Sequence, residues 1–242
     1  MGGTPPDLAR LEALLDPAER ARAHAARRPE LRRRFVLAHA ATRILLGERL
    51  GRPPERLRLS RGRWGKPVVP NAPGLHFNLS HSGELALLAV APRPVGVDVE
   101  LVRSGRDVDR LSRRFFPAPE RELVARGGRP AFARLWTRKE ACVKAVGGRL
   151  AEGLALPVAH AAAQATVHAP DPAHAPGTPG TPVGPVGPWR VADLPLPAEP
   201  EPYAGSVALL GDGPFAVSWH TWTRWAPWDG SSVDEASRTG VK

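Results

Sequence analysis

Apolar residues recur every three to four positions in two early stretches of the chain. The stretch LRRRFVLAHAATRILLGERL, residues 31–50, has this period and predicts a helix with one buried face that ends at Gly51. A weaker pattern over residues 7–27 predicts one or two short helices, in which Asp16 and Pro17 form an N-terminal cap and first turn.

A period of two replaces the helical period further along the chain. LHFNLSHS (75–82) predicts a strand that ends in a polar turn, and ELALLAVA (84–91) predicts a buried strand. VGVDVE (95–100) predicts the next strand after a short Pro-Arg-Pro connection. We therefore expect a hairpin over residues 84–100.

The second half of the chain contains both periods. Helices are predicted over residues 106–116, 119–123 and 130–148. Strands are predicted over residues 189–194, 203–211 and 215–222. The segment 169–188 is rich in Pro and Gly and predicts a mobile loop.

A helix followed by strands occurs once in each half of this sequence. This repetition predicts an α+β fold made of two similar lobes in one chain, residues 1–99 and 100–225, with a disordered tail over 226–242. A length of 242 residues with 42% hydrophobic content is enough for two such cores.

Composition narrows the classes of protein. The single cysteine, Cys142, excludes an internal disulfide and disfavours a thiolate zinc site. The sequence has no apolar leader and no segment long enough to span a bilayer, so we expect a cytoplasmic protein with no membrane partner. The net charge of +10 favours nucleic acid, a phosphorylated small molecule or an acidic protein as partner, unless the arginines only solvate the surface.

The strand VGVDVE carries two carboxylates on one face. Alternation along a strand places Asp98 and Glu100 together, and like charges so close need a positive partner, either a basic side chain or a metal ion. Glu140 on the predicted helix 130–148 adds a third carboxylate, and an all-oxygen set suits Mg²⁺ or Mn²⁺. Glu140 and Lys144 also have the spacing of an ordinary surface ion pair, which is the alternative interpretation.

The segment FNLSHSG (77–83) places two hydroxyls and an imidazole at a strand end. Ser80 and His81 do not form a nucleophile elbow, so a Ser–His nucleophile is disfavoured. They remain candidate phosphate ligands, or parts of a capped turn with an exposed histidine. RGRWGKP (61–67) lacks the spacing of a phosphate-binding P-loop, although Lys66 is a candidate anion contact.

Four short motifs stand in a characteristic order along the chain. They are GKP (65–67), FNLSHSG (77–83), VGVDVE (95–100) and WTRKEACVK (136–144). In this order and spacing they resemble the 4′-phosphopantetheinyl transferases of the Sfp (surfactin-synthetase-activating) type. The resemblance also includes the helix RRRFVLAHAATRILLG and covers roughly residues 15–150.

This resemblance implies a fold and a ligand set. The family is a pseudo-dimer of two α/β lobes with coenzyme A in the cleft between them. It implies that Asp98, Glu100 and Glu140 hold Mg²⁺ against the coenzyme A pyrophosphate, and that Lys144 contacts the phosphates and assists the leaving group. The metal ion would then be the positive partner of the strand carboxylates.

The resemblance also implies contacts with the rest of coenzyme A. Ser80 and His81 would bind phosphates, His81 the 3′-phosphate, and Lys66 would lie beside the adenine. Arg43 and Arg22 would face the 3′-phosphate. The sequence departs from the family over residues 19–30, where extra residues are present and Glu19 stands at a position that is basic in the family.

The expected reaction follows from the resemblance. A serine hydroxyl of an apo acyl or peptidyl carrier protein attacks the β-phosphate of coenzyme A, and adenosine 3′,5′-bisphosphate leaves. Glu140, or a water beside it, accepts the serine proton. We expect a monomer that is steered to acidic carrier proteins and binds no nucleic acid. The alternatives are a basic nucleic-acid-binding protein and another Mg²⁺-dependent phosphotransfer enzyme acting without a carrier protein.

Overall fold

The computed structural model describes residues 7–103, 107–160, 165–167, 187–196 and 201–222. Its contacts divide the chain into two units, Met1–Arg58 with Ala216–Lys242, and Leu59–Phe215. Each unit is described separately below. The boundary expected between residues 99 and 100 lies inside a strand of the second unit, Val95–Leu101.

The regular elements described in the first unit are helices. They are α1 (Leu8–Ala13), α2 (Pro17–His24), α3 (Pro29–Leu50) and the short 3₁₀ helix η1 (Pro54–Arg56). The sequence predicted the start of α2 correctly, because Asp16 accepts a hydrogen bond from the Glu19 amide at 2.8 Å and Pro17 follows it. Gly51, with φ 60°, ends α3 in the left-handed conformation that glycine adopts without strain.

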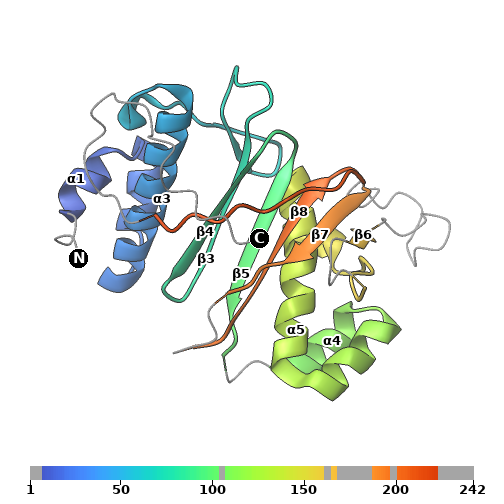
Figure 1. The fold of residues 1–242 in the computed structure, drawn as a ribbon. Coiled ribbons are helices and arrows are strands. Elements are labelled where there is room, and N and C mark those ends of the chain that lie inside the picture. The colour runs from blue at the N-terminus through green and yellow to red at the C-terminus, as the bar shows by residue number, and fades with distance from the viewer. Residues whose placement is uncertain (1–6, 104–106, 161–164, 168–186, 197–200, 223–242) are drawn as a thin grey trace. The chain divides into compact units, whose positions relative to one another are not determined.

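The part of the second unit that the structure describes contains three antiparallel sheets. Two are small hairpins, β1 (Ser60–Arg61) with β2 (Pro67–Val68), and β3 (His76–Ser82) with β4 (Leu85–Ala91). The third has four strands in the order β5-β8-β7-β6. Their bounds are Val95–Leu101 for β5, Tyr203–Leu210 for β8, Trp189–Asp193 for β7 and Ala165–Val167 for β6. In Figure 1, β5 lies between the β3-β4 hairpin and β8.

The expected hairpin over residues 84–100 is wrong. Strand β4 pairs with β3, and β5 pairs with β8, where Asp98 lies opposite Ser206. The reason is local, because Ser82 and Leu85 pair across a two-residue turn in which Gly83 has φ 56°. The expected polar turn at the end of 75–82 is therefore a continuation of β3 up to Ser82.

The long helix α5 (Ala118–Val146) packs along β5 and β8. It joins two segments that the sequence predicted as separate helices, and Gly128, with φ 58°, interrupts the helical backbone between them. Helix α4 (Val108–Phe115) precedes α5 and packs against it, and the short helix α6 (Leu150–Gly153) follows α5 in the chain. The core between α5 and the sheet includes these side chains: Val124, Phe132, Leu135, Ala141, Cys142, Trp189, Val191 and Ala208.

A helix packed on an antiparallel sheet confirms the mixed α+β class. The strands expected near 189–194 and 203–211 are present, whereas the strand expected at 215–222 is wrong. That segment is rich in aromatic and β-branched residues but meets no partner strand among the described residues. Most of the expected loop 169–188 and the whole tail 226–242 lie outside the described residues. No described helix has the length and apolar character to cross a membrane.

Candidate active site

Helix α5 approaches β5 closely at Gly96. A Cβ atom placed on Gly96 would lie 2.0 Å from the carbonyl oxygen of Ala141 and 2.4 Å from the nitrogen of Ala145. Gly96 shares its strand face with Asp98 and Glu100, so this contact brings the carboxylate face of β5 against the helix. The two backbones can meet this closely only because residue 96 has no side chain.

Asp98 and Lys144 form the centre of the site. The Nζ atom of Lys144 donates to Oδ1 of Asp98 at 2.5 Å, and the hydroxyl of Ser80 donates to the same oxygen at 2.9 Å. Asp98 is buried, whereas the Lys144 side chain is 30% exposed. Of the two positive partners considered from the sequence, the structure therefore shows a basic side chain at Asp98.

The other two carboxylates interact with this pair. Burial raises the pKa of Glu140, Lys144 lowers it, and the negative charges of Asp98 and Glu100 raise it further, with a net increase. Burial also raises the pKa of Asp98, although the nearby Lys144 and Ser80 oppose the change. The structure thus brings together the strand and helix carboxylates, and the charges of Asp98 and Glu100 make a proton or a cation more favourable at Glu140.

The carboxylates do not form a finished metal site. In the part of the chain that the structure describes, no group of three His, Cys, Asp or Glu side chains is positioned to hold a metal ion by itself. However, Oδ2 of Asp98 is buried without a hydrogen-bond partner in the structure. Magnesium binds through one or two carboxylates, waters and substrate phosphates rather than a closed protein cage. The donor set therefore fits Mg²⁺ that is held jointly with a phosphorylated substrate.

Lys66 joins β5 to the end of α5. Its Nζ atom donates to the carbonyl oxygens of Val95 at 2.8 Å and Ala145 at 2.7 Å. Burial lowers the pKa of Lys66 to about 8. The sequence suggested an anion contact here, but the described contacts of the ammonium group are with main-chain carbonyls. Ser80 is buried beside Asp98, while His81 is exposed near the end of β3.

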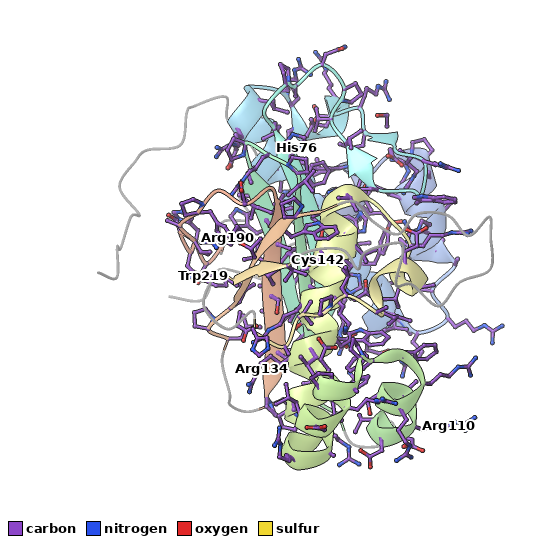
Figure 2. The ribbon with its side chains drawn as sticks, turned by 90° about the vertical axis from the view of Figure 1, so that its right-hand side faces the viewer. His76, Arg110, Arg134, Cys142, Arg190 and Trp219 are labelled. Carbon is purple, nitrogen blue, oxygen red and sulfur yellow. The ribbon has the colours of Figure 1, made fainter. Side chains whose placement is uncertain are left out.

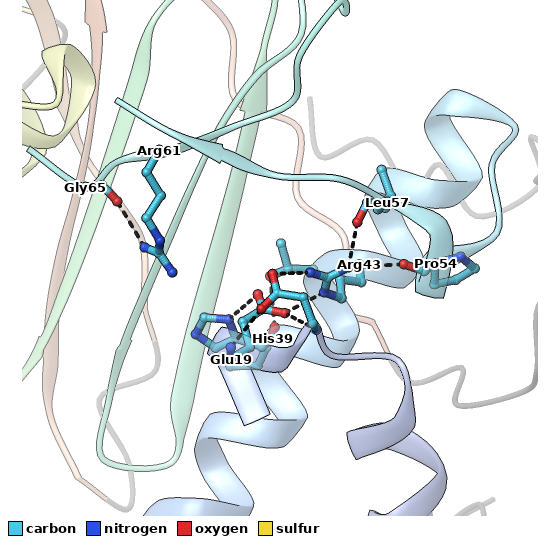
Figure 3. Close-up of polar contacts among 10 residues, drawn as sticks. Glu19, His39, Arg43, Pro54, Leu57, Arg61 and Gly65 are labelled. Atoms are coloured by element: carbon cyan, nitrogen blue, oxygen red, sulfur yellow. Dashed lines mark hydrogen bonds and ion pairs between the residues drawn. The ribbon is translucent and has the colours of Figure 1, made fainter. Parts of the chain in front are cut away.

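Arg43 lies in a buried cluster of the first unit (Figure 3). Its guanidinium donates to Glu19 at 2.6 Å, to Asp16 at 2.8 Å and to the carbonyl of Leu57 at 3.0 Å. The side chain is 1% exposed and its charge is balanced by two carboxylates, so this geometry does not support the expected phosphate contact. Arg22 is exposed, with its guanidinium 5.5 Å from the centre of the Phe35 ring.

Two groups of contacts were missed from the sequence. Asn78 and Ser82 direct polar side chains from β3 toward β5, whereas the sequence suggested Ser82 only as one of the hydroxyls at a strand end. Only the spacing of two around Ser80 could have indicated these contacts. Lys139 and Glu120 form a buried ion pair at 2.6 Å that no local pattern reveals.

Cys142 on α5 (Figure 2) is buried, and burial raises the pKa of its thiol to about 12, which excludes a thiolate nucleophile at neutral pH.

The comparisons with known proteins match the region of the chain that carries these residues. The family model described as the 4′-phosphopantetheinyl transferase superfamily matches residues 94–170, which include β5 and α5. The transferase HetI of Nostoc sp. is 39% identical over 150 residues, covering 59% of this chain and 63% of HetI. The transferase Sfp of Bacillus subtilis is 32% identical over 163 residues, covering 60% of this chain and 70% of Sfp.

The coverage is partial for most relatives. The chain spans about three fifths of the length of three of these relatives. It covers 63% of HetI, 59% of a transferase from Bacillus subtilis and 61% of psf-1 from Bacillus pumilus. The match to Sfp covers more than two thirds of that protein. Together with the family-model match and the carboxylates on β5 and α5, it shows that this chain belongs to the 4′-phosphopantetheinyl transferase superfamily and is of the Sfp type.

Proposed function

We propose that this chain transfers the 4′-phosphopantetheine arm of coenzyme A to a serine hydroxyl of an apo acyl or peptidyl carrier protein. The reaction depends on Mg²⁺ and releases adenosine 3′,5′-bisphosphate. The observation that carries the proposal is the contact of Asp98 on β5 with Lys144 on α5, inside the region that the family model matches. The printed names of the relatives describe this class of transferase.

Three carboxylates would hold the metal ion. They are Asp98, Glu100 and Glu140, and the charges of the first two raise the pKa of Glu140. When bound, Mg²⁺, or Mn²⁺ in its place, would neutralise charge on the pyrophosphate oxygens. The unpartnered Oδ2 of Asp98 supports this assignment, because a buried carboxylate oxygen without a donor is costly unless a ligand satisfies it.

Lys144 would act on the phosphates of coenzyme A. Its ammonium group is partly exposed, so it can keep its contact with Asp98 and still donate to an incoming phosphate oxygen. An ammonium has three N–H donors, and two directions are taken by Asp98 and Ser80. The group would stabilise the negative charge that develops on the departing bisphosphate.

Glu140 would accept the proton of the carrier serine, directly or through one water. Burial and the negative charges of Asp98 and Glu100 raise its pKa, which makes its carboxylate a stronger base than an ordinary glutamate. This chain needs no nucleophile of its own because the attacking hydroxyl belongs to the carrier protein. The buried thiol of Cys142 is consistent with that view.

Fewer residues are proposed to contact the rest of coenzyme A than the resemblance implies. His81 is exposed and stays a proposed ligand of the 3′-phosphate, and Arg22 is exposed and stays a second one. Ser80 and Lys66 would act mainly by holding Asp98 and β5 in place, and the proposal omits Arg43. We also propose that the protein is a monomer made of two similar lobes, since helices precede strands in each half of the chain. Its net charge of +10 would attract acidic carrier proteins.

Product analysis tests this function against its alternatives. The wild-type chain is incubated with coenzyme A, Mg²⁺ and an apo carrier protein, and nucleotides are separated by chromatography. We expect adenosine 3′,5′-bisphosphate in equal amount to modified carrier, and none when the acceptor serine of the carrier is replaced by alanine. Nucleotide release without carrier would instead indicate a hydrolytic phosphotransfer enzyme.

A further inference from the structure

Side chains of β3 cover one edge of β5. Strand β5 pairs with β8 along one side, and alternate amides point away from that partner. Three side chains of β3 accept hydrogen bonds from these amides. The bonds run from Val97 N to Asn78 Oδ1 at 2.8 Å, from Val99 N to Ser80 Oγ at 3.3 Å and from Leu101 N to Ser82 Oγ at 3.0 Å.

We call Asn78, Ser80 and Ser82 the β3 row. Its members are spaced by two, as are the outward amides of β5, so the two strands match in register without main-chain pairing. An unpaired edge amide that is buried is costly, and the β3 row satisfies each of the three. The polar residues at alternate positions of FNLSHS thus accept hydrogen bonds from the edge amides of β5.

The two serines of the β3 row also contact the site carboxylates. The Ser80 hydroxyl donates to Asp98 at 2.9 Å, and the Ser82 hydroxyl donates to Glu100 at 3.3 Å. In each case the same oxygen accepts a bond from the amide of the residue that follows the carboxylate. A hydroxyl has one donor, so accepting the amide fixes the oxygen while its proton is left for the carboxylate.

The third member of the β3 row differs in an informative way. Asn78 stands beside the position of Gly96, where β5 has no carboxylate, and it accepts a hydrogen bond from the amide of Val97. Serine therefore occurs in the β3 row where β5 carries an acidic side chain, and an amide side chain occurs where it does not. A serine hydroxyl accepts the amide and donates to the carboxylate through one and the same oxygen, whereas the acceptor and the donors of asparagine are different atoms.

We propose that Ser80 and Ser82 are positioning residues for the metal-binding carboxylates. Each hydroxyl fixes one carboxylate relative to the β5 backbone, Ser80 for Asp98 and Ser82 for Glu100. The proposal rests on the proposed function in so far as these carboxylates bind Mg²⁺. Hydrogen bonds to metal ligands from surrounding side chains commonly change metal affinity by about 10-fold to 100-fold.

Ser82→Ala tests this role, and Ser82→Thr is its matched rescue variant because threonine keeps the hydroxyl. Ser112→Ala is the control, since the Ser112 hydroxyl donates to a nearby main-chain carbonyl within α4, Asp109 O, at 3.0 Å, away from β3 and β5 in the sequence. Two properties are measured on the full chain. They are amide hydrogen exchange at Leu101 by NMR, and binding of Mn²⁺ in the presence of coenzyme A by electron paramagnetic resonance.

We expect Ser82→Ala to speed exchange of the Leu101 amide about tenfold, as loss of one hydrogen bond would. We expect it to weaken Mn²⁺ binding about tenfold, with recovery of both properties in Ser82→Thr and no change in Ser112→Ala. Unchanged Leu101 exchange would overturn the edge contact, and faster exchange with unchanged Mn²⁺ affinity would overturn the positioning role. Wild-type protein that binds no Mn²⁺ would overturn the metal assignment itself, which the Leu101 exchange does not depend on.

Discussion

The ammonium nitrogen of Lys144 lies 2.5 Å from Oδ1 of Asp98, which joins the last turn of α5 to the middle of β5. The contact combines a buried carboxylate with a partly exposed cation, so Lys144 can be solvated if its partner is lost. Replacing Asp98 should therefore lower the transfer activity while leaving the protein folded.

Asp98→Asn should reduce carrier loading by at least about 100-fold, the usual cost of removing one preorganised charged or polar group from an active site. The fold should survive because asparagine keeps the size of aspartate and can accept the bond from Ser80. Initial loading rates at saturating Mg²⁺ measure the first effect, and urea denaturation measures the second. Full activity of the folded variant would contradict the role of Asp98.

Gly96→Ala should lower both stability and activity. The new methyl group would fall 2.0 Å from the carbonyl oxygen of Ala141, so β5 and α5 must separate. Overpacking of this kind costs about 1–3 kcal/mol of unfolding free energy, and the shift also parts Asp98 from Lys144. Gly62→Ala is the control, because its nearest atom would be Lys66 O at 3.6 Å. Equal stability of the two variants in urea would contradict the close approach.

Lys139→Met should destabilise the second unit strongly. Lys139 and Glu120 pair at 2.6 Å with side chains that are 0% and 1% exposed, so the variant leaves a buried carboxylate without its cation. Loss of one partner of a buried pair costs about 3–5 kcal/mol. Arg10→Ala removes the exposed pair with Asp7 and should cost less than about 1 kcal/mol. Urea denaturation of both variants measures the difference, and similar values would refute the importance of burial.

Glu19 should make the free energy of unfolding depend on pH in the acid range. Burial raises its pKa, but hydrogen bonds from His39 and the Asp16 amide, with the charge of Arg43, lower it from 4.5 to about 2. Because the pKa in the folded state is below the unfolded value, this contribution is complete above pH 4.5 and is lost as pH falls toward 2. The loss is about 3 kcal/mol.

Unfolding free energy measured in urea between pH 6 and pH 2 (about the range that titrates this carboxyl) tests the Glu19 prediction. Glu19→Gln removes the titrating group and should reduce the acid-induced loss, because other carboxylates continue to titrate. Parallel pH profiles for the wild type and the variant would show that Glu19 titrates normally in the folded protein.

Signals confined to one segment were read correctly from the sequence. The cap formed by Asp16 and the glycine stop at Gly51 depend on neighbouring residues, and both occur as expected. The carboxylates of VGVDVE could be assigned to one strand face because alternation is also local. The helix carrying Glu140 and Lys144 was predicted for the same reason.

Features that depend on distant residues were not read correctly. Strand β5 pairs with β8, which lies about a hundred residues later, so no local rule could exclude a hairpin with β4. Arg43 looked like a helix-surface cation, yet Glu19, 24 positions earlier, neutralises it inside the first unit. The contact of Ser82 with Glu100 likewise became visible only when the packing of β3 on β5 was known.

Intact-mass spectrometry of an apo carrier protein tests the central claim most directly. The carrier is incubated with the wild-type chain, coenzyme A and Mg²⁺, and in parallel with Asp98→Asn and with the metal chelated. Our account predicts a mass gain of one phosphopantetheine arm on the acceptor serine in the first reaction alone. No gain on carriers from fatty acid, polyketide and nonribosomal peptide synthesis, or an equal gain with Asp98→Asn, would contradict it.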